Sequence, residues 1–410
     1  MRILMITPYV TINSRSEFTR NKTGFGYMVY DIAKSLGQLE NVSVLTTDTV
    51  GRDFEIEGVR YLRRSYGLFI KNVLYCISPL IVLKLWAQYR MQFPTLIRLI
   101  YYWMMSGYIA KTIKSGKYDM VHMHQCMFDT EIWMAVCKKC NQRFIVTLHG
   151  LNSFSETVHL EPAGKRYERN FLHRVVNGYI HITVISTGIL RIIEKTYDVK
   201  DCKEIDVVCN SFSFGSEGEY VNIRDKYNLP KEAKIILYVG NVCVRKNQRQ
   251  FVAAFNKLPQ QLIDSTYVLF LGRELDSEYE FSEQVADSPY SNHFIICGNI
   301  DKEMVAHYYR QGDAVALISL SEGFGLSLVE GLHFGLPCMS FTDMDAFEDI
   351  YDPNVMVGVS GHEVGEIAKG IERLLKTEWN TDFIKDYSIK FEPSFMAENY
   401  IKVYRKLIGR

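Results

Sequence analysis

Residues 314–341 read AVALISLSEGFGLSLVEGLHFGLPCMSF, and this stretch contains the clearest sequence signal of the fold class. It begins with an apolar run, Ala314 to Ser319, continues through a glycine turn and a helix-length segment, and ends in a second apolar run, Cys338 to Phe341. Apolar runs that are bounded by turn residues and separated by a helix-length segment are typical of buried parallel strands joined by a helix. The stretch therefore predicts one repeating unit of a parallel α/β sheet.

The same alternation continues outward through both halves of the chain. The other strands that it predicts are Ile3 to Thr7, Val42 to Thr46, Met120 to His124, Phe144 to Leu148, His181 to Ile185, Ile235 to Gly240, Tyr267 to Gly272 and Phe294 to Gly298. The length of 410 residues fits two domains better than one. We therefore predict an α/β protein with two doubly wound, Rossmann-like parallel-sheet domains that face a cleft.

The interval from Asn210 to Asp225 is polar and poor in strand patterns, so we place the hinge near Ser211 to Gly218. This gives an N-terminal domain at 1–211, a C-terminal domain at 212–391, and a closing helix at 392–410 that we expect to cross back to the N-terminal domain. Ligands of such sheets bind at the carboxyl ends of the strands. The substrates are therefore expected at those ends.

Composition excludes some classes of function. The 47 basic and 47 acidic residues balance, which disfavours generic nucleic-acid binding. The nine cysteines are an odd number spread over both halves, and Cys137-x-x-Cys140 has no second pair, so zinc or disulfide chemistry is disfavoured. The first apolar run is too short for a signal peptide. We expect a cytoplasmic protein.

One segment has an unusual charge pattern. From Arg60 to Lys117 there are ten Lys or Arg residues and no Asp or Glu, and aromatic residues lie between them. The apolar runs here are interrupted by charges, which disfavours a membrane span. Two interpretations stay open: helices packed on the sheet with solvated charges, or a peripheral surface at an anionic inner membrane. The residues proposed for an acceptor or membrane surface are Lys71, Lys84, Trp86, Arg90, Arg98 and Trp103.

The glycine turn at Gly323-Phe324-Gly325 opens a helix with Glu322 before it and Glu330 inside it. A helix N-terminus presents free amides and a positive dipole end, which suits a phosphate, and a carboxylate can hold sugar hydroxyls. The combination predicts a nucleotide-sugar site.

Three segments together resemble the retaining glycosyltransferases of family 4, also called group 1, which have the GT-B fold. They are TGFGYMVYDIAKSL from Thr23, ILYVGNVCVRKNQ from Ile235 and SEGFGLSLVEGLHFGLP from Ser321, and DMVHMH from Asp119 and VTLHG from Val146 extend the likeness. The resemblance implies an enzyme that moves a hexosyl or N-acetylhexosaminyl group from a UDP- or GDP-type donor to a glycan or lipid-linked acceptor. It also implies a role in surface polysaccharide or glycoconjugate assembly.

The resemblance also implies residue roles. Glu322, with the backbone amides of Gly323, Phe324 and Gly325, would hold the transferred sugar and the distal phosphate. Glu330 would bind the ribose diol.

Lys246 would lie on the diphosphate, and His149 near the donor sugar's primary hydroxyl. The catalytic group is thus expected to be Glu322, His149 and Lys246, with Gly24 letting the backbone approach a ligand. Asn241 stands where the family has an arginine, so either Arg245 replaces that charge or the site uses one cation.

We expect no cofactor and no metal, because GT-B enzymes generally need none and His122-x-His124 has no evident third ligand. Asp343-x-Asp345 falls where the family has a glycine-rich loop, which leaves the acceptor side open. Two alternatives to the transferase remain: a non-catalytic GT-B subunit that stabilises a partner transferase, and another GT-B sugar-nucleotide enzyme.

Overall fold

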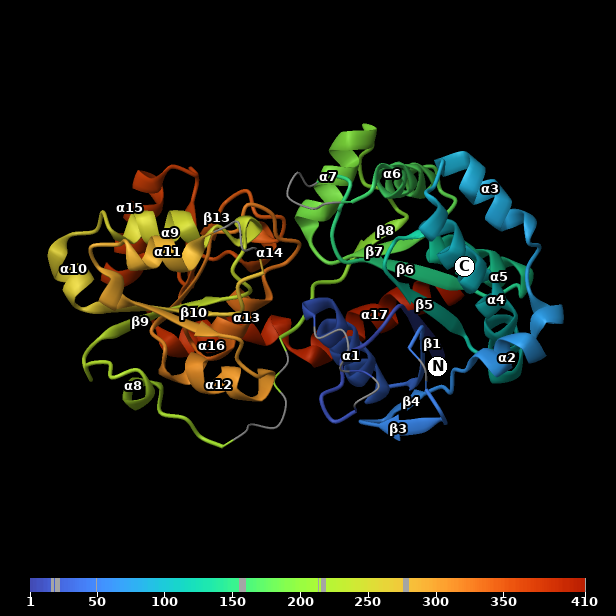
Figure 1. The fold of residues 1–410 in the computed structure, drawn as a ribbon, viewed down its shortest axis with the longest axis horizontal. Helices are drawn as coiled ribbons and strands as arrows, with labels where there is room; N and C mark the ends of the chain where they lie inside the picture. The colour runs from blue at the N-terminus through green and yellow to red at the C-terminus, as the bar shows by residue number, and fades with distance from the viewer. Residues whose placement is uncertain are drawn as a thin grey trace. The chain divides into compact units, whose positions relative to one another are not determined.

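The computed structural model divides the chain into two compact units (Figure 1). It describes residues 1–15, 18, 23–48, 50–154, 160–212, 214, 219–275 and 280–409. Unit 1 comprises Met1–Ile185, Ile189–Val208 and Pro393–Arg410, and unit 2 comprises Ser186–Gly188 and Cys209–Glu392. Most of the hinge predicted at 211–218 lies outside the described residues.

In its described part, unit 1 contains an eight-stranded sheet of order β3-β4-β2-β1-β5-β6-β7-β8. Its strands are β1 (Arg2–Thr7), β2 (Asn41–Thr46), β3 (Phe54–Ile56), β4 (Val59–Tyr61), β5 (Met120–His124), β6 (Phe144–Leu148), β7 (Ile182–Val184) and β8 (Ile205–Val207). All neighbours pair in parallel except β3 and β4, which form an antiparallel hairpin. The hairpin turn is Glu57-Gly58, where both φ angles are positive, 51° and 73°, as tight two-residue hairpins require.

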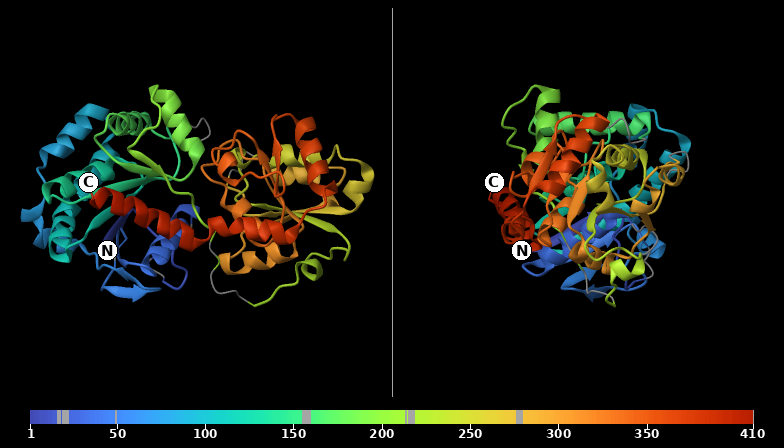
Figure 2. Two further views of the ribbon diagram at one scale, coloured as in Figure 1. Left: turned by 180° about the vertical axis from the view of Figure 1, so that it is seen from behind. Right: turned by 90° about the vertical axis from the view of Figure 1, so that its left-hand side faces the viewer.

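The helices of unit 1 are α1 (Gly24–Gly37), α2 (Tyr66–Lys71), α3 (Leu80–Tyr89), α4 (Phe93–Gly116), α5 (Phe128–Lys139), α6 (Pro162–Val176), α7 (Thr187–Tyr197) and α17 (Pro393–Ile408), with a short 3-10 turn η2 (Val73–Tyr75). Helix α17 packs against α1 and the sheet and buries Tyr400 and Tyr404 in the same core as Ile3 and Ile32. Figure 2 (left) shows α17 in dark red against the elements of unit 1. The last residues of the chain thus complete the core of the first domain.

Unit 2 contains a parallel sheet of order β11-β10-β9-β12-β13-β14 in its described residues. The strands are β9 (Lys234–Val239), β10 (Thr266–Leu271), β11 (Phe294–Gly298), β12 (Ala314–Leu317), β13 (Cys338–Phe341) and β14 (Met356–Val359). The helices are α8 (Ile223–Lys226), α9 (Gln248–Phe255), α10 (Gln260–Asp264), α11 (Phe281–Ala286), α12 (Lys302–Gln311), α13 (Leu326–His333), α14 (Phe347–Ile350), α15 (Val364–Lys376) and α16 (Thr381–Ser388). The 3-10 turns of unit 2 within the described residues are η3 (Val244–Lys246), η5 (Ser291–His293) and η6 (Ile389–Phe391).

Helices cover both faces of the unit 2 sheet, with α9, α11 and α15 on one face and α12, α13 and α16 on the other (Figure 1). This arrangement explains why the central strands are almost wholly apolar: β12 and β13 are buried along their entire length. The chain order reverses between β9 and β12 in unit 2 and between β1 and β5 in unit 1. Each reversal is a topological switch point, where open α/β sheets bind their ligands.

The predicted fold class is confirmed for the two parallel-sheet units, and each predicted strand lies within two residues of an observed one. The sequence pattern did not predict the short strands β3, β4, β8 and β14. None of the helices in the described ranges is long and apolar enough to cross a membrane.

Candidate functional site

At the switch point of unit 2, two glycines allow the loops that follow β9 and β10 to lie against each other. Gly240 has a φ of +144° and Gly272 a φ of +150°. A Cβ atom on Gly272 would lie 2.3 Å from the carbonyl oxygen of Gly240, and one on Gly240 would lie 3.2 Å from Cε of Lys246. Side chains at these positions would therefore displace the loop that carries Lys246.

Glu322 and two cations form an ion cluster between this loop and the end of β12. Nζ of Lys246 lies 2.5 Å and Nη1 of Arg245 lies 3.2 Å from Oε2 of Glu322. Arg245 also donates to the carbonyl oxygen of Ser321 at 2.9 Å. The side chains of Lys246 and Glu322 are only 12% and 16% exposed, whereas that of Arg245 is 36% exposed. The predicted catalytic residues Glu322 and Lys246 and the predicted donor-binding residue Arg245 are thus brought together.

The cluster keeps Glu322 ionised. Burial alone would raise the pKa of Glu322, but the charges and hydrogen bonds of Lys246 and Arg245 outweigh burial and lower it. A carboxylate with a lowered pKa is an acceptor-only group at neutral pH. Glu322 can therefore accept hydrogen bonds from sugar hydroxyls without itself carrying a proton.

A second carboxylate, Asp345, is coupled electrostatically to Glu322. Burial first, and then the negative charges of Glu322 and Asp343, raise the pKa of Asp345 to about 6. Its carbonyl oxygen accepts a hydrogen bond from the amide of Gly188, 2.9 Å away within unit 2. The sequence analysis included Asp345 only as part of Asp343-x-Asp345, which stands where the family has a glycine-rich loop. Its titration near neutral pH marks it as a further candidate for the site.

The predicted phosphate turn has the backbone geometry of a helix start. Gly325 precedes α13 with a φ of +85°, and no side chain caps the helix. Phe324 is buried, and its ring lies edge-on to Phe391 with 6.1 Å between centroids, which anchors the turn. The first amides of a helix have no intrahelical acceptor. The start of α13, directly after the turn from Gly323 to Gly325, therefore presents donors that fit an anion.

Glu330 lies on α13 and is held by a tyrosine that the motif does not contain. The hydroxyl group of Tyr309, on α12, donates to Oε2 of Glu330 at 2.7 Å. Tyr309 is fully buried, and its ring stacks on Phe334 with 5.6 Å between centroids. This contact fixes the rotamer of Glu330 and makes Tyr309 a supporting residue of the site.

In unit 1, His149 directly follows β6 and pairs with His124, the last residue of β5. Nε2 of His149 lies 3.0 Å from Nδ1 of His124, and the ring of Phe25 lies edge-on to His149 at 5.2 Å. Burial lowers the pKa of His149 to about 3, so the imidazole is neutral. Its Nδ1 is buried and has no hydrogen-bond partner within the described ranges. The predicted contact of His149 with a donor sugar stays a prediction.

Behind this pair, a hydrogen-bonded network runs through the core of unit 1. Nε2 of His122 lies 2.6 Å from Oγ1 of Thr147, which lies 2.5 Å from Oγ1 of Thr183. The hydroxyl group of Tyr404, on α17, lies 2.7 Å from Nδ1 of His122. The histidines of the predicted His122-x-His124 motif thus bond to Thr147, Tyr404 and His149. In the described part of the chain, no group of three His, Cys, Asp or Glu side chains could hold a metal ion.

The two glycines that begin α1 differ in their surroundings. A Cβ atom on Gly26 would lie 2.2 Å from Oγ1 of Thr11, whereas one on Gly24 would meet nothing within 4 Å. Gly26 is therefore needed by the fold. Gly24 borders open space at the helix start, next to the N-cap residue Thr23, and its predicted approach to a ligand stays a prediction.

The segment from Arg60 to Lys117 folds largely into α2, η2, α3 and α4 and exposes both charges and apolar groups. Lys71, Lys84, Arg90 and Arg98 are all exposed. Trp86 is 43% exposed, whereas Trp103 is half-buried and donates to the carbonyl oxygen of Ile77 at 2.8 Å. The exposed apolar side chains of this segment are Tyr66, Ile70, Val73, Leu74, Tyr75, Leu80, Leu83, Trp86, Phe93, Ile97 and Ile100.

Two family models match the chain, one on each half. The model for Glycosyltransferase Family 4 matches residues 23–213, and the model for Glycosyl transferases group 1 matches residues 220–390. The chain is also 22% identical over 317 residues to an alpha-monoglucosyldiacylglycerol synthase of Acholeplasma laidlawii, across 73% of this chain and 76% of that protein.

Solved structures share the fold over the whole chain. A sucrose-phosphate synthase of Thermosynechococcus elongatus superposes with a TM-score of 0.70 at 16% identity, covering 100% of both chains. HepE of Anabaena in complex with UDP superposes with a TM-score of 0.67 at 14% identity, covering 99% of this chain and 100% of that one. With one model matched on each half, the motif-based assignment is confirmed: this chain belongs to the family 4, group 1 glycosyltransferases and has their GT-B fold.

Proposed function

We propose that this glycosyltransferase moves a hexose or N-acetylhexosamine from a nucleotide-sugar donor to a glycan or lipid-linked acceptor, with retention of configuration. The observation that carries the proposal is the cluster of Glu322, Lys246 and Arg245 at the switch point of unit 2. It combines an ionised carboxylate for sugar hydroxyls with two cations for a diphosphate. A UDP-type donor is supported by the UDP in the complex of HepE, and a GDP-type donor remains the alternative.

Each polar group has a task in this proposal. The amides from Gly323 to Gly325 bind the distal phosphate, Glu330 binds the ribose diol, and the unpaired Nδ1 of His149 meets a hydroxyl of the donor sugar. Lys246 contacts Glu322 in the structure, and we expect it to contact the diphosphate when the donor is bound. A cation at 2.5 Å from a carboxylate is held in place before the substrate arrives.

For the reaction we propose front-face transfer. The acceptor hydroxyl forms a bond to the anomeric carbon on the side from which the nucleoside diphosphate leaves, and the bond from that carbon to the phosphate oxygen breaks. A phosphate oxygen takes the hydroxyl proton. Negative charge grows on the leaving diphosphate, so Lys246 and Arg245 stabilise the transition state more than the ground state. No cofactor or metal enters the proposal.

Arg245 supplies the second positive charge, because Asn241, which stands where the family has an arginine, is neutral. Its guanidinium lies 3.2 Å from the carboxylate that Lys246 also contacts, so both cations share one site. Because two cations are present, each offsets only part of the negative charge on the diphosphate. The proposal therefore assigns Arg245 the task that the arginine after the strand has in other members.

The donor is tested by thermal unfolding with UDP, GDP and their sugar nucleotides. A ligand that binds only the folded protein raises the melting temperature by mass action. We expect one nucleotide class to stabilise wild type and to lose most of that effect in Glu330→Ala. If no nucleotide or nucleotide sugar shifts the melting curve, the non-catalytic GT-B subunit becomes the better function. Binding of a sugar nucleotide without transfer to any glycan or lipid acceptor would favour another GT-B sugar-nucleotide enzyme.

For the location, we propose a cytoplasmic protein that lies peripherally on the anionic inner face of a membrane. The observation behind it is the segment from Arg60 to Lys117, which joins ten basic residues, no acid and a run of exposed apolar side chains. Leu74 is 93% exposed and Phe93 is 71% exposed. Soluble surfaces rarely gather such side chains unless they bind something. A lipid-linked acceptor follows from this location, and a soluble glycan is the alternative.

A further inference from the structure

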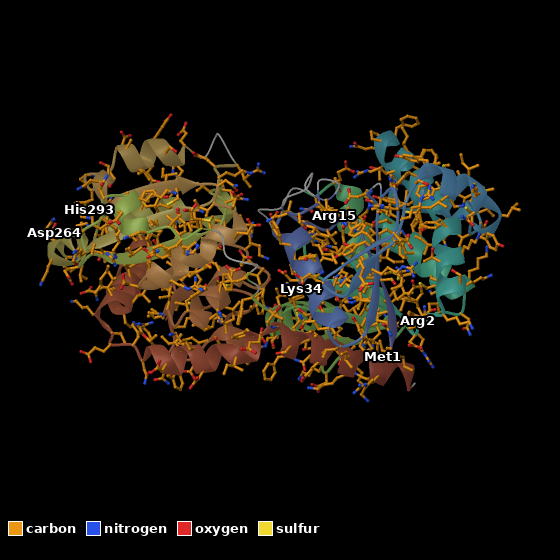
Figure 3. The ribbon with its side chains drawn as sticks, turned by 90° about the horizontal axis from the view of Figure 1, so that it is seen from below. Met1, Arg2, Arg15, Lys34, Asp264 and His293 are labelled. Carbon is orange, nitrogen blue, oxygen red and sulfur yellow. The ribbon has the colours of Figure 1, made fainter. Side chains whose placement is uncertain are left out.

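Unit 1 contains a cavity of about 340 Å³ that the glycosyl-transfer proposal does not use. It lies at the amino-terminal edge of the sheet, whereas His124 and His149 lie at the carboxyl edge. Its walls come from the start of β1, from β2 and β4, from the end of α2 and from the last turns of α4. Figure 3 labels Arg2, the wall residue at the start of β1.

The charged groups of the wall are mostly basic. They are Arg2, Arg60, Lys111 and one carboxylate, Asp53. That carboxylate is already satisfied, because Oδ2 accepts from Nη2 of Arg60 at 2.6 Å and Oδ1 accepts from the amide of Arg63 at 2.7 Å. No carboxylate among the described residues pairs with the side chains of Arg2 or Lys111. Two cations at this wall therefore remain available to an anion.

The wall also holds acceptors that need a donor. The last turn of α4, ending at Gly116, adds helix-end carbonyls that have no intrahelical donor. A bare phosphate would leave these oxygens unmatched and would face the negative end of the helix dipole. A ligand with hydroxyl groups would satisfy them.

We propose that this cavity binds a phosphorylated monosaccharide or polyol, with its phosphate at Arg2 and Lys111 and its hydroxyl groups at the end of α4. The volume is at the small end of ligand pockets, which fits one sugar ring with one phosphate and excludes a dinucleotide. The proposal is independent of sugar transfer, because the cavity belongs to the opposite edge of the sheet from His149. The same chemistry occurs in free sugar phosphates and in phosphoinositol headgroups.

The first test is calorimetric titration with glucose 6-phosphate in the presence of saturating UDP. Binding is expected for wild type and for Lys246→Ala, and both inorganic phosphate and glucose should bind at least about tenfold more weakly. Lys111→Gln and Arg2→Gln should each weaken the binding of glucose 6-phosphate by about tenfold or more. The matched control is Lys114→Gln, an exposed lysine of the same helix that does not line the cavity, and it should bind like wild type.

Ser115→Trp is a second variant for the same site, because Ser115 lines the cavity and is exposed, so a large side chain fills the space without entering the core. It should abolish binding while the melting temperature stays near that of wild type. Equal binding by Lys111→Gln, loss of binding in Lys246→Ala, or no binding by wild type would overturn the proposal. Transfer activity is measured separately, so failure here leaves the transferase proposal intact.

Vesicles separate the two sources of the ligand. Wild type is compared on phosphatidylinositol and phosphatidylglycerol vesicles of equal charge density. A preference for phosphatidylinositol that Lys111→Gln removes assigns the cavity to a lipid headgroup. Equal binding to both vesicles, together with calorimetric binding of glucose 6-phosphate, assigns it to a free sugar phosphate.

Discussion

The two units place opposite chemistry at the carboxyl edges of their parallel sheets. At the switch point of unit 2, an ionised Glu322 contacts Lys246 and Arg245, and its pKa is lowered. At the carboxyl edge of unit 1, buried histidines pair with one another, and burial lowers the pKa of His149 to about 3. The fold supplies the location, and the side chains decide whether it suits a charged leaving group or a neutral hydroxyl.

The largest expected effect is on the charged side of this comparison. Lys246→Ala should lower kcat by about 10²-fold or more, because it removes a cation that stabilises charge on the leaving diphosphate. Steady-state release of the nucleoside diphosphate measures it, with the exposed Lys257→Ala as control. Unchanged turnover would remove Lys246 from the transfer site. If Arg245→Ala, measured in parallel, changed kcat little, Arg245 would not replace the positive charge that is missing at Asn241.

Glu330 gives the next effect, on binding rather than rate. Glu330→Ala should weaken nucleotide binding by about 10- to 100-fold, since charge-assisted hydrogen bonds contribute about 1.5–3 kcal/mol. Tyr309→Phe keeps the carboxylate but removes the donor 2.7 Å from it, so a smaller loss is expected. Calorimetry with UDP and GDP measures both. Equal affinity in Glu330→Ala and wild type would mean that Glu330 only supports the packing of α12 and α13 through Tyr309.

The two regions also differ in how far the sequence could predict them. Glu322, Lys246 and Arg245 were predicted from motifs that resemble those of the family, and they meet because their loops follow β12 and β9, neighbouring parallel strands that end at the same edge. The contact between Tyr309 and Glu330 was not predicted. It joins helices α12 and α13, and no local sequence pattern encodes which faces of two helices meet. The pair His124 and His149 could have been derived from the adjacency of β5 and β6.

The same reasoning explains the missed strands. The central strands β12 and β13 are buried along their length and lack charged residues, so each is visible in the sequence as an apolar run. Strands β3 and β4 are three residues each, and their middle residues, Glu55 and Arg60, are charged, so neither strand forms an apolar run. Their pairing is set by the turn at Gly58 and by the neighbouring strand β2. Strand β14 contains Gly358, which packs close to Phe347 and has little strand propensity of its own.

The third prediction concerns the basic segment of unit 1. Changing Lys71, Lys84, Arg90 and Arg98 to Gln should lower binding to anionic vesicles by about tenfold at physiological salt, because each basic residue near the surface contributes up to about 1 kcal/mol before screening. Sedimentation at low and high salt measures it. The control changes four exposed lysines elsewhere: Lys231, Lys257, Lys385 and Lys402. Equal binding by both variants, or none by wild type, would leave the segment as a packed and solvated surface and favour a soluble acceptor.

The smallest expected effect tests the neutral side of the comparison through pH. The pKa of His149 is about 3 in the folded protein, whereas the ordinary pKa of a histidine side chain is 6.5. Between these values the unfolded chain binds more protons than the folded one, so stability rises with pH and falls as the solution is acidified. From pH 6.5 to 5.5 a single such histidine contributes a loss of about 1 kcal/mol, which is a few degrees in melting temperature.

His149→Gln should therefore flatten the decline of the melting temperature between pH 6.5 and 5.5. Thr183→Val is the matched control, because it removes a hydroxyl group from the adjoining buried network but no titrating group. It should lower the melting temperature at every pH and keep the wild-type slope. If His149→Gln also keeps that slope, the imidazole of His149 is protonated in the folded protein. The carboxyl edge of unit 1 would then carry a positive charge, and the contrast with the charged edge of unit 2 would fail.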